Sequence, residues 1–252
     1  MKNVGFFLFI AFIFASCAKD GSLAESSVSE GKGGSMARFA IQGDVLYTVS
    51  THKMQVFSIK EAANPTNAGS LNIGFDVETI FPLDSLLFIG SRSGMFVYDI
   101  NEPASPKLLS QVQHIRSCDP VVAQGNYAYV TLNTNFSACG ASLNNVLNIY
   151  DITNPTVPIL KQTVSLTGPT GLGIENDKLF VCDKGLKVFD LSDPVNIQQI
   201  FEFSNADGVN IREAYDVIPF DGLLMLIAKE GLFQFDYSDD QLKFLSKIQI
   251  AP

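Results

Sequence analysis

The chain has 252 residues, of which 46% are apolar and 17% are charged, and its formal net charge is −9. This composition supplies a sizeable core and excludes an intrinsically disordered chain. The acidic balance argues against nucleic-acid binding, because a phosphate backbone is bound chiefly by clustered Lys and Arg. Two His and four Cys offer little for a zinc site. We therefore expect neither a metal nor a cofactor.

The first sixteen residues have the features of an export signal. Lys2 gives a positive start, and residues 4–15 form an apolar run that is too short to span a bilayer but suits a signal peptide. The run ends at Phe14-Ala15-Ser16-Cys17, which resembles the lipobox of bacterial lipoproteins. The resemblance implies removal of residues 1–16 and acylation of Cys17. The alternative is an ordinary secretory signal that happens to precede a Cys.

Residues 17–35 are small, polar and rich in glycine, which predicts a flexible tether between the lipid and a folded domain. The lipoprotein resemblance implies an outer-membrane protein of a Gram-negative, Bacteroidetes-like bacterium, facing the periplasm or the cell surface. Membrane contact is expected through the lipid only.

One pattern occurs five times in the rest of the chain. Segments of alternating apolar residues end in an aspartate at Asp99, Asp151, Asp190 and Asp236, and a fifth copy has Ser58 in that place. A β-rich run and a Gly, Asn or Asp turn precede each copy. Each unit therefore reads as four short strands, and units of this size are typical of β-propeller blades.

We accordingly predict an all-β fold, a single five-bladed β-propeller of four-stranded antiparallel blades. The propeller is expected over residues 37–252, with blades at approximately 37–74, 75–116, 117–168, 169–210 and 211–252. The five quartets run in phase, so no strand is obviously shared between the first and last blades. Blade 1 then closes the ring by packing alone, or residues 28–36 add a strand.

The repeated aspartate has a structural interpretation. A Pro turn follows Asp99, Asp151 and Asp190, and a carboxylate in this place can accept backbone N–H groups of the turn. We expect these residues to stabilise turns rather than to catalyse a reaction.

Two of the copies resemble a known family. Val146-Leu-Asn-Ile-Tyr-Asp-Ile-Thr-Asn-Pro155 and Gly185-Leu-Lys-Val-Phe-Asp-Leu-Ser-Asp-Pro194 are similar to the LVIVD repeat of bacterial and archaeal surface or secreted proteins. That resemblance implies β-propeller blades over about residues 37–252. It implies no catalytic residue.

The turns between the second and third strands should share one face of the ring with the connections between blades. Cations gather in these segments, which favours binding of an anionic or polyhydroxylated ligand at this face: Lys53, Arg92, His114, Arg116, Lys184 and Lys229. The alternative is that exposed turns are simply polar, and that neighbouring Asp and Glu residues neutralise the cations.

The cysteines allow one bridge. The third unit has a longer turn that contains Cys139, and Cys118 starts the adjacent inner strand. A Cys118–Cys139 disulfide is therefore plausible in an exported protein, with Cys182 as the rival partner or a buried free thiol.

The predicted function is binding of a protein or glycan ligand at the loop face, by a monomer. The alternative is a glycan-active hydrolase or lyase at the same mouth. Convergent buried carboxylates in the channel would favour the enzyme, and a Phe-filled channel would favour the binding protein. A third possibility is a component of an envelope complex, which should expose an apolar patch on a blade edge.

Overall fold

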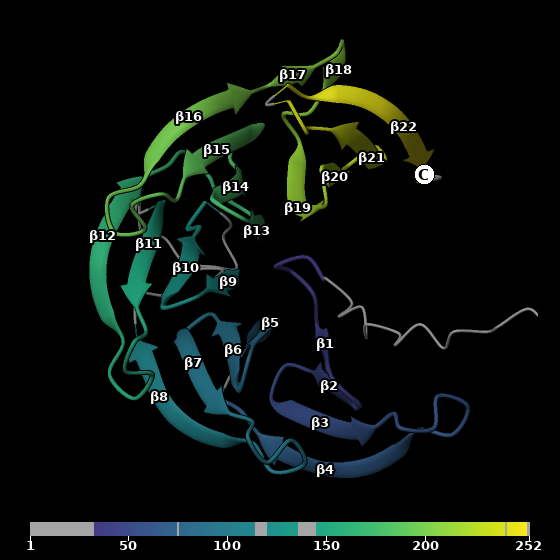
Figure 1. The fold of residues 1–252 in the computed structure, drawn as a ribbon, viewed down its shortest axis with the longest axis vertical. Coiled ribbons are helices and arrows are strands. Elements are labelled where there is room, and N and C mark those ends of the chain that lie inside the picture. The colour runs from purple at the N-terminus through teal and green to yellow at the C-terminus, as the bar shows by residue number, and fades with distance from the viewer. Residues whose placement is uncertain (1–32, 75, 114–119, 136–144, 240, 251–252) are drawn as a thin grey trace, which may run out of the picture.

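The computed structural model describes residues 33–74, 76–113, 120–135, 145–239 and 241–250, and these residues form strands and turns without a helix. None of them belongs to a helix that could cross a membrane. Five four-stranded antiparallel sheets, whose strands pair in chain order, are arranged as the blades of a β-propeller (Figure 1). The predicted fold class is confirmed.

The strands of each blade follow one another from the channel outwards. Blades 1 and 2 comprise β1 (Phe39–Gln42), β2 (Val45–Val49), β3 (Lys53–Ser58), β4 (Thr66–Asn72), β5 (Val77–Leu83), β6 (Leu86–Ser91), β7 (Gly94–Asp99) and β8 (Lys107–Gln113). Blades 3, 4 and 5 comprise β9 (Val121–Gln124), β10 (Tyr127–Leu132), β11 (Val146–Asp151), β12 (Ile159–Ser165), β13 (Leu172–Glu175), β14 (Lys178–Cys182), β15 (Leu186–Asp190), β16 (Gln198–Phe203), β19 (Ala214–Phe220), β20 (Leu223–Ala228), β21 (Gly231–Asp236) and β22 (Lys243–Gln249).

A small hairpin interrupts the repeat between blades 4 and 5. It consists of β17 (Asn205–Ala206) and β18 (Val209–Asn210). The carboxylate of Asp207 at its tip accepts the backbone N–H of Phe244 on β22 at 3.2 Å. The sequence pattern does not predict this element.

The first turn of every blade has the same backbone conformation. The residue after the innermost strand has a positive φ in all five: Gly43, Asp84, Gly125, Asn176 and Asp221. Two-residue hairpin turns need this conformation to follow the twist of the strands, and Gly, Asn and Asp adopt it most readily. This is why these residue types recur at this place in the sequence.

The repeated aspartates stabilise the turn after the third strand, as predicted. Asp99, Asp151 and Asp190 each accept the backbone N–H of the second residue that follows, at 2.8, 3.0 and 2.8 Å. Hydrogen bonds from Thr153 and Ser192 hold the pKa values of Asp151 and Asp190 below the usual range. A register shift between the third and fourth strands accompanies these turns in every blade.

Each blade has two apolar faces, which we name by the neighbour they meet. The forward face meets the next blade along the chain, and the backward face meets the preceding one. The second strand supplies the central forward residue of blades 1–4, each buried: Tyr47, Phe88, Tyr129 and Phe180. Each of them packs against a buried residue on the backward face of the next blade. These partners, also on second strands, are Leu87, Ala128, Leu179 and Leu224. Because each sheet is apolar on both sides, each needs a neighbour on both sides.

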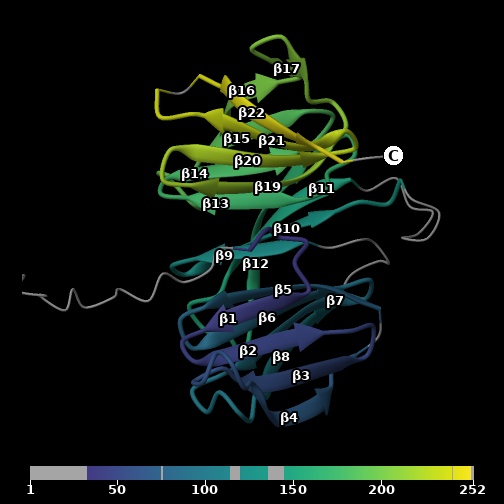
Figure 2. The same ribbon diagram turned by 90° about the vertical axis from the view of Figure 1, so that its right-hand side faces the viewer.

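Among the residues that the structure describes, the ring is open between blade 5 and blade 1. Successive inner strands β1, β5, β9, β13 and β19 pack side by side, but blades 5 and 1 stand apart on the right of Figure 1. Figure 2 looks into this side, and β9 and β10 of blade 3 are seen between the two end blades. Among the described residues, blade 1 does not pack on blade 5, so the ring does not close there by packing alone. Residues 33–36 form no strand, and residues 28–32, the rest of the segment expected to add one, lie outside the described residues.

Residues Gly33–Ala37 connect the two halves of the arc instead. The Ser35 hydroxyl donates to Asp216 on β19 at 3.1 Å and accepts the backbone N–H of Leu172 on β13 at 2.8 Å. At the other end of the segment, the Ala37 carbonyl accepts the N–H of Ile80 on β5 at 3.1 Å. We call Gly33–Ala37 the crossing segment.

Candidate functional site

The crossing segment lies in the central channel, between two pockets. Gly33, Gly34 and Ala37 line a cavity of about 450 Å³ at the end where the inner strands finish. Met36 lines a second pocket of about 230 Å³ at the end where the inner strands begin. The channel therefore has two separate mouths with different chemistry.

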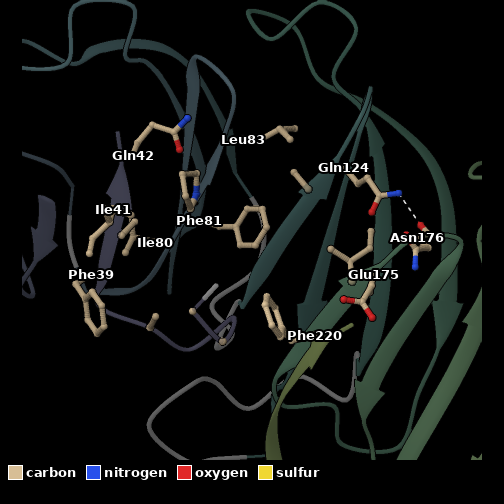
Figure 3. Close-up of a pocket in the computed structure, with 17 residues that line it drawn as sticks. Phe39, Ile41, Gln42, Ile80, Phe81, Leu83, Gln124, Glu175, Asn176 and Phe220 are labelled. Carbon is tan, nitrogen blue, oxygen red and sulfur yellow. Dashed lines mark hydrogen bonds between the residues drawn. The ribbon is translucent and has the colours of Figure 1, made fainter. Parts of the chain in front are cut away.

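The larger pocket is apolar and receives residues from the inner strands of all five blades. Its walls include the side chains of Phe39, Ile80, Phe81, Ile174 and Phe220, and Figure 3 shows the Phe81 and Phe220 rings projecting into it. We call it the apolar cavity. Its size is typical of ligand pockets, which are lined mainly by apolar side chains with a few polar groups.

The polar groups of the apolar cavity lie at its rim. Gln124 donates through its side-chain amide to the carbonyl of Asn176 at 2.6 Å (Figure 3), and Gln42 donates to the carbonyl of Asp84 at 3.2 Å. Glu175 accepts the backbone N–H of Asp221 at 2.8 Å. These bonds join the first turns of neighbouring blades, so the rim is fixed by contacts between blades.

The smaller pocket is polar. Arg38, Glu78, Thr79, Asn133 and Thr170 contribute to its walls. Arg38 is exposed, and no carboxylate in the described part of the chain forms an ion pair with it. The turns between second and third strands surround this mouth. It lies on the face at which the sequence predicts ligand binding.

Asp216 anchors the crossing segment inside the channel. Its carboxylate accepts the Ser35 hydroxyl at 3.1 Å and the backbone N–H of Val217 at 3.0 Å. Burial raises the pKa of Asp216 to about 6, although these hydrogen bonds oppose the rise. A Cβ at Gly34 or Gly171 would overlap the Asp216 carboxylate, so glycine is required at both positions for the segment to pass this closely.

The four predicted ligand-binding cations that lie within the described residues are near the turns around the polar pocket, but they line neither of the two pockets. Arg92 forms ion pairs with Glu78 at 3.2 Å and Asp76 at 3.6 Å, and Lys229 pairs with Glu213 at 3.7 Å. Lys53 starts β3 and Lys184 lies in the turn after β14, both exposed. These ion pairs are of the kind that the alternative interpretation expects, in which neighbouring Asp and Glu residues neutralise the cations.

Other predicted site residues lie outside the described residues: Cys17, His114, Arg116, Cys118 and Cys139. The signal peptide, and the tether as far as residue 32, lie there too. Among the described residues, Cys182 is a buried free thiol. Burial, with Asp216 and Asp183 nearby, raises its pKa well above the ordinary value.

Sequence analysis missed the two residues that shape the channel. In the sequence Arg38 belongs to a short β-rich run, whereas in the structure it directly precedes the innermost strand β1 and lies at the mouth. Asp216 also belongs to a β-rich run, and its one available signal is a charge inside an otherwise apolar run. Its partner Ser35 is 181 residues away, a separation that no local pattern reports.

Comparison with known proteins supports the repeat and the fold. The LVIVD repeat matches residues 115–136 and 137–165, which include the first of the two copies quoted above. No curated protein is a match in sequence. The chain thus carries LVIVD repeats in its third blade, within a β-propeller.

Solved structures share the fold at low identity. A functionally unknown protein from Desulfotomaculum acetoxidans DSM 771 matches with a TM-score of 0.65 and 13% identity, over 87% of this chain and 71% of that one. Apo AztD from Citrobacter koseri gives 0.61 and 11% identity, over 82% and 61%. BamB from Moraxella catarrhalis gives 0.52 and 12% identity, over 84% and 60%. In each case the chain spans only part of the longer protein.

Proposed function

We propose that this chain is a lipid-anchored β-propeller that binds a protein ligand, whose apolar group enters the apolar cavity. The observation that carries the proposal is the composition of that cavity. A pocket of about 450 Å³ with Phe and Ile walls suits an aliphatic or aromatic side chain better than a glycan, whose hydroxyl groups would lose hydrogen bonds to water there.

The carboxylates of the described channel favour binding over glycan hydrolysis. Glycosidases of the common kinds need two carboxyl groups that flank one bond. Here Glu175 accepts a backbone N–H, Glu78 pairs with Arg92 at the opposite mouth, and Asp216 holds Ser35. Each of the three has a structural partner, and they come from different levels of the channel.

The lipid anchor is proposed from the sequence. Phe14-Ala15-Ser16-Cys17 supports acylation of Cys17, with display on the outer membrane of a Gram-negative cell. In a diderm host fed labelled palmitate, the wild-type protein should take up label and fractionate with membranes. The Cys17→Ser variant should lose both properties. Equal labelling of the two proteins would contradict the anchor.

The binding proposal can be tested with the neutral naphthalene dye prodan as a probe of the apolar cavity. Saturable binding is expected, and Gln124→Trp at the rim should weaken it at least tenfold by blocking the entrance. Gln113→Trp is the matched control, because Gln113 is exposed at the end of the outer strand β8 and does not line the cavity. Equal binding by both variants would contradict the proposal.

The class of ligand is decided by competition. Peptides selected on an array of immobilised sequences should displace the dye from the wild-type protein and should bind Gln124→Trp weakly. If glycans bind the chain and no peptide does, the assignment to a protein ligand is wrong.

A further inference from the structure

The mouth of the apolar cavity is bordered by the first turn of every blade. The residues that line the cavity include the last residue of each inner strand: Gln42, Leu83, Gln124, Glu175 and Phe220. The first turns follow these residues directly along the chain. The entrance to the cavity is therefore surrounded by five turns, one from each blade.

These turns are acidic. They contain four aspartates, all of them exposed: Asp44, Asp84, Asp177 and Asp221. Within the five described turns and the strand ends beside them, the one cation is Lys178, which stands opposite Glu175 in the sheet register. No cation of the described residues forms an ion pair with any of the four aspartates. The entrance therefore has an excess of negative charge.

The fold does not need these four charges. Blade 3 forms the same turn with Gly125 and Asn126, which carry no charge, and Gly and Asn accept a positive φ as readily as Asp does. The aspartates after the third strands bond to backbone N–H groups, whereas the carboxylates of the four in the first turns accept no hydrogen bond from the described residues. Their charge is therefore available to a ligand.

The entrance is also apolar at its centre. Phe39 and Phe220 line the cavity and remain 54% and 50% exposed. Figure 3 shows the Phe220 ring opposite that of Phe81. Large apolar side chains that stay in water around a pocket mark an interaction site, and the face of a phenyl ring attracts a cation. The mouth thus combines aromatic walls with a ring of carboxylates.

The opposite mouth lacks this excess of negative charge. Arg92 forms ion pairs with Glu78 and Asp76, and Lys229 pairs with Glu213. The acidic residues there are thus neutralised by neighbouring cations. The negative charge around the apolar cavity is therefore a property of that face and not of the whole surface.

We infer that the protein ligand presents a basic segment to this mouth, in which Lys or Arg residues flank the apolar side chain that enters the apolar cavity. The inference rests on the proposed function, because it concerns the ligand of the same cavity. The apolar side chain meets the phenyl rings, and the flanking cations meet the aspartates of the turns. Complementary charge of this kind speeds association and excludes partners of the wrong sign.

Peptide binding measured by isothermal titration calorimetry tests the inference. Three synthetic peptides share a central Phe and differ only in the residues on both sides of it, which are Lys, Gln or Glu. The Lys peptide should bind the wild-type protein at least tenfold more tightly than the Gln peptide, and the Glu peptide should bind most weakly. Salt screens exposed charges, so this preference should shrink between about 0.02 M and about 0.5 M salt.

Neutral variants locate the preference at the mouth. Asp84→Asn combined with Asp221→Asn removes two of the four carboxylates, and Asn accepts the positive φ of both residues. The preference for the Lys peptide over the Gln peptide should fall at least threefold. The control combines Glu213→Gln with Glu230→Gln, which removes the same charge from exposed residues that precede β19 and β21 at the opposite face, and it should keep the preference. Both double variants should bind prodan as the wild-type protein does, which shows that they fold.

The inference and the proposed function fail separately. Gln124→Trp at the rim should weaken binding of both the Lys and the Gln peptide. If it does so but the two peptides bind the wild-type protein equally, the inference is wrong and the cavity still accepts the apolar group. The inference is also wrong if both double variants lose the preference equally, or if neither loses it. If no peptide binds, or if Gln124→Trp binds the Lys peptide as the wild-type protein does, the proposed function is wrong and the inference with it.

Discussion

The four interblade interfaces and the open side of the ring use the same repeat positions with different outcomes. Phe180 at the forward face of blade 4 is buried against blade 5, whereas Met225 at the same place in blade 5 remains partly exposed. The repeat therefore specifies a sheet with two apolar faces, and the neighbour decides whether those faces leave water. Blades 1 and 5 are built on the same repeat as the other blades, but among the described residues each lacks a neighbouring blade on one face.

Leucine truncation should show the largest difference between the two regions. Leu87→Ala removes a fully buried side chain and should lower the free energy of unfolding by about 2–5 kcal/mol. Leu46→Ala is the same change at the equivalent place of blade 1. It should cost only about 1 kcal/mol, because Leu46 is already partly exposed and the change removes less buried apolar area. Chemical denaturation measures both. Equal losses would mean that the ring closes on blade 1 in solution.

The crossing segment connects the two halves of the arc through the channel, and its anchor responds to pH. The pKa of Asp216 is raised by burial from 3.8 to about 6, so the folded state holds its proton more tightly than the unfolded state between these values. Stability should fall as pH rises from about 4 to 6, by about 3 kcal/mol from this group. Above pH 6 the full cost is present.

Asp216→Asn should remove this dependence. The stability curve of the variant should be flatter than that of the wild-type protein between pH 4 and 6, because Asn keeps the shape and does not titrate. Cys182 is the other ionisable group close by, and its raised pKa keeps it protonated throughout this range. Parallel curves for the two proteins would contradict the anchoring role of Asp216.

The turn aspartates give a smaller contrast between interior and end blades. Asp190→Ala in blade 4 should lower Tm at pH 7, because the backbone N–H of Ser192 loses its acceptor. The pKa of Asp190 is lowered, so the stabilisation is present above pH 4 and is lost as pH falls through the lowered pKa. Ser58→Asp in blade 1 should restore the missing acceptor and raise Tm slightly. An unchanged Tm for Asp190→Ala would contradict the structural interpretation of these residues.

Gln234→Val should have the smallest effect on the isolated protein. It gives the forward face of blade 5 the residue found at the equivalent position of blade 4. Without a neighbouring blade, the free energy of unfolding should change by no more than about 0.5 kcal/mol. In a closed ring the same substitution would bury the new side chain and stabilise the fold clearly. A rise in Tm of several degrees would therefore argue against an open side.

Much of the fold was predictable because it is local. Alternation of apolar residues, the residues with positive φ after each inner strand, and the aspartate turns all act within a few positions of the chain. Ring closure depends on the angle between successive sheets, which comes from sheet twist and from packing between blades. No segment of sequence reports that angle.

The candidate site was less predictable for the same reason. The loop cations were visible as charged turns, but the apolar cavity is made by single residues from five inner strands, and each of them reads in the sequence as ordinary core. The anchor of the crossing segment joins Ser35 to Asp216. It was recognisable only once the strands were assembled.

Thiol labelling tests the open side most directly. Cys182 on the forward face of blade 4 is buried and free, and Ile227 is its equivalent on blade 5. In a chain with Cys17, Cys118 and Cys139 changed to Ser, an Ile227→Cys thiol should react with an aqueous maleimide under native conditions, while Cys182 should react only on unfolding. Protection of both thiols would show that blade 5 is covered in the isolated protein and would contradict the open ring.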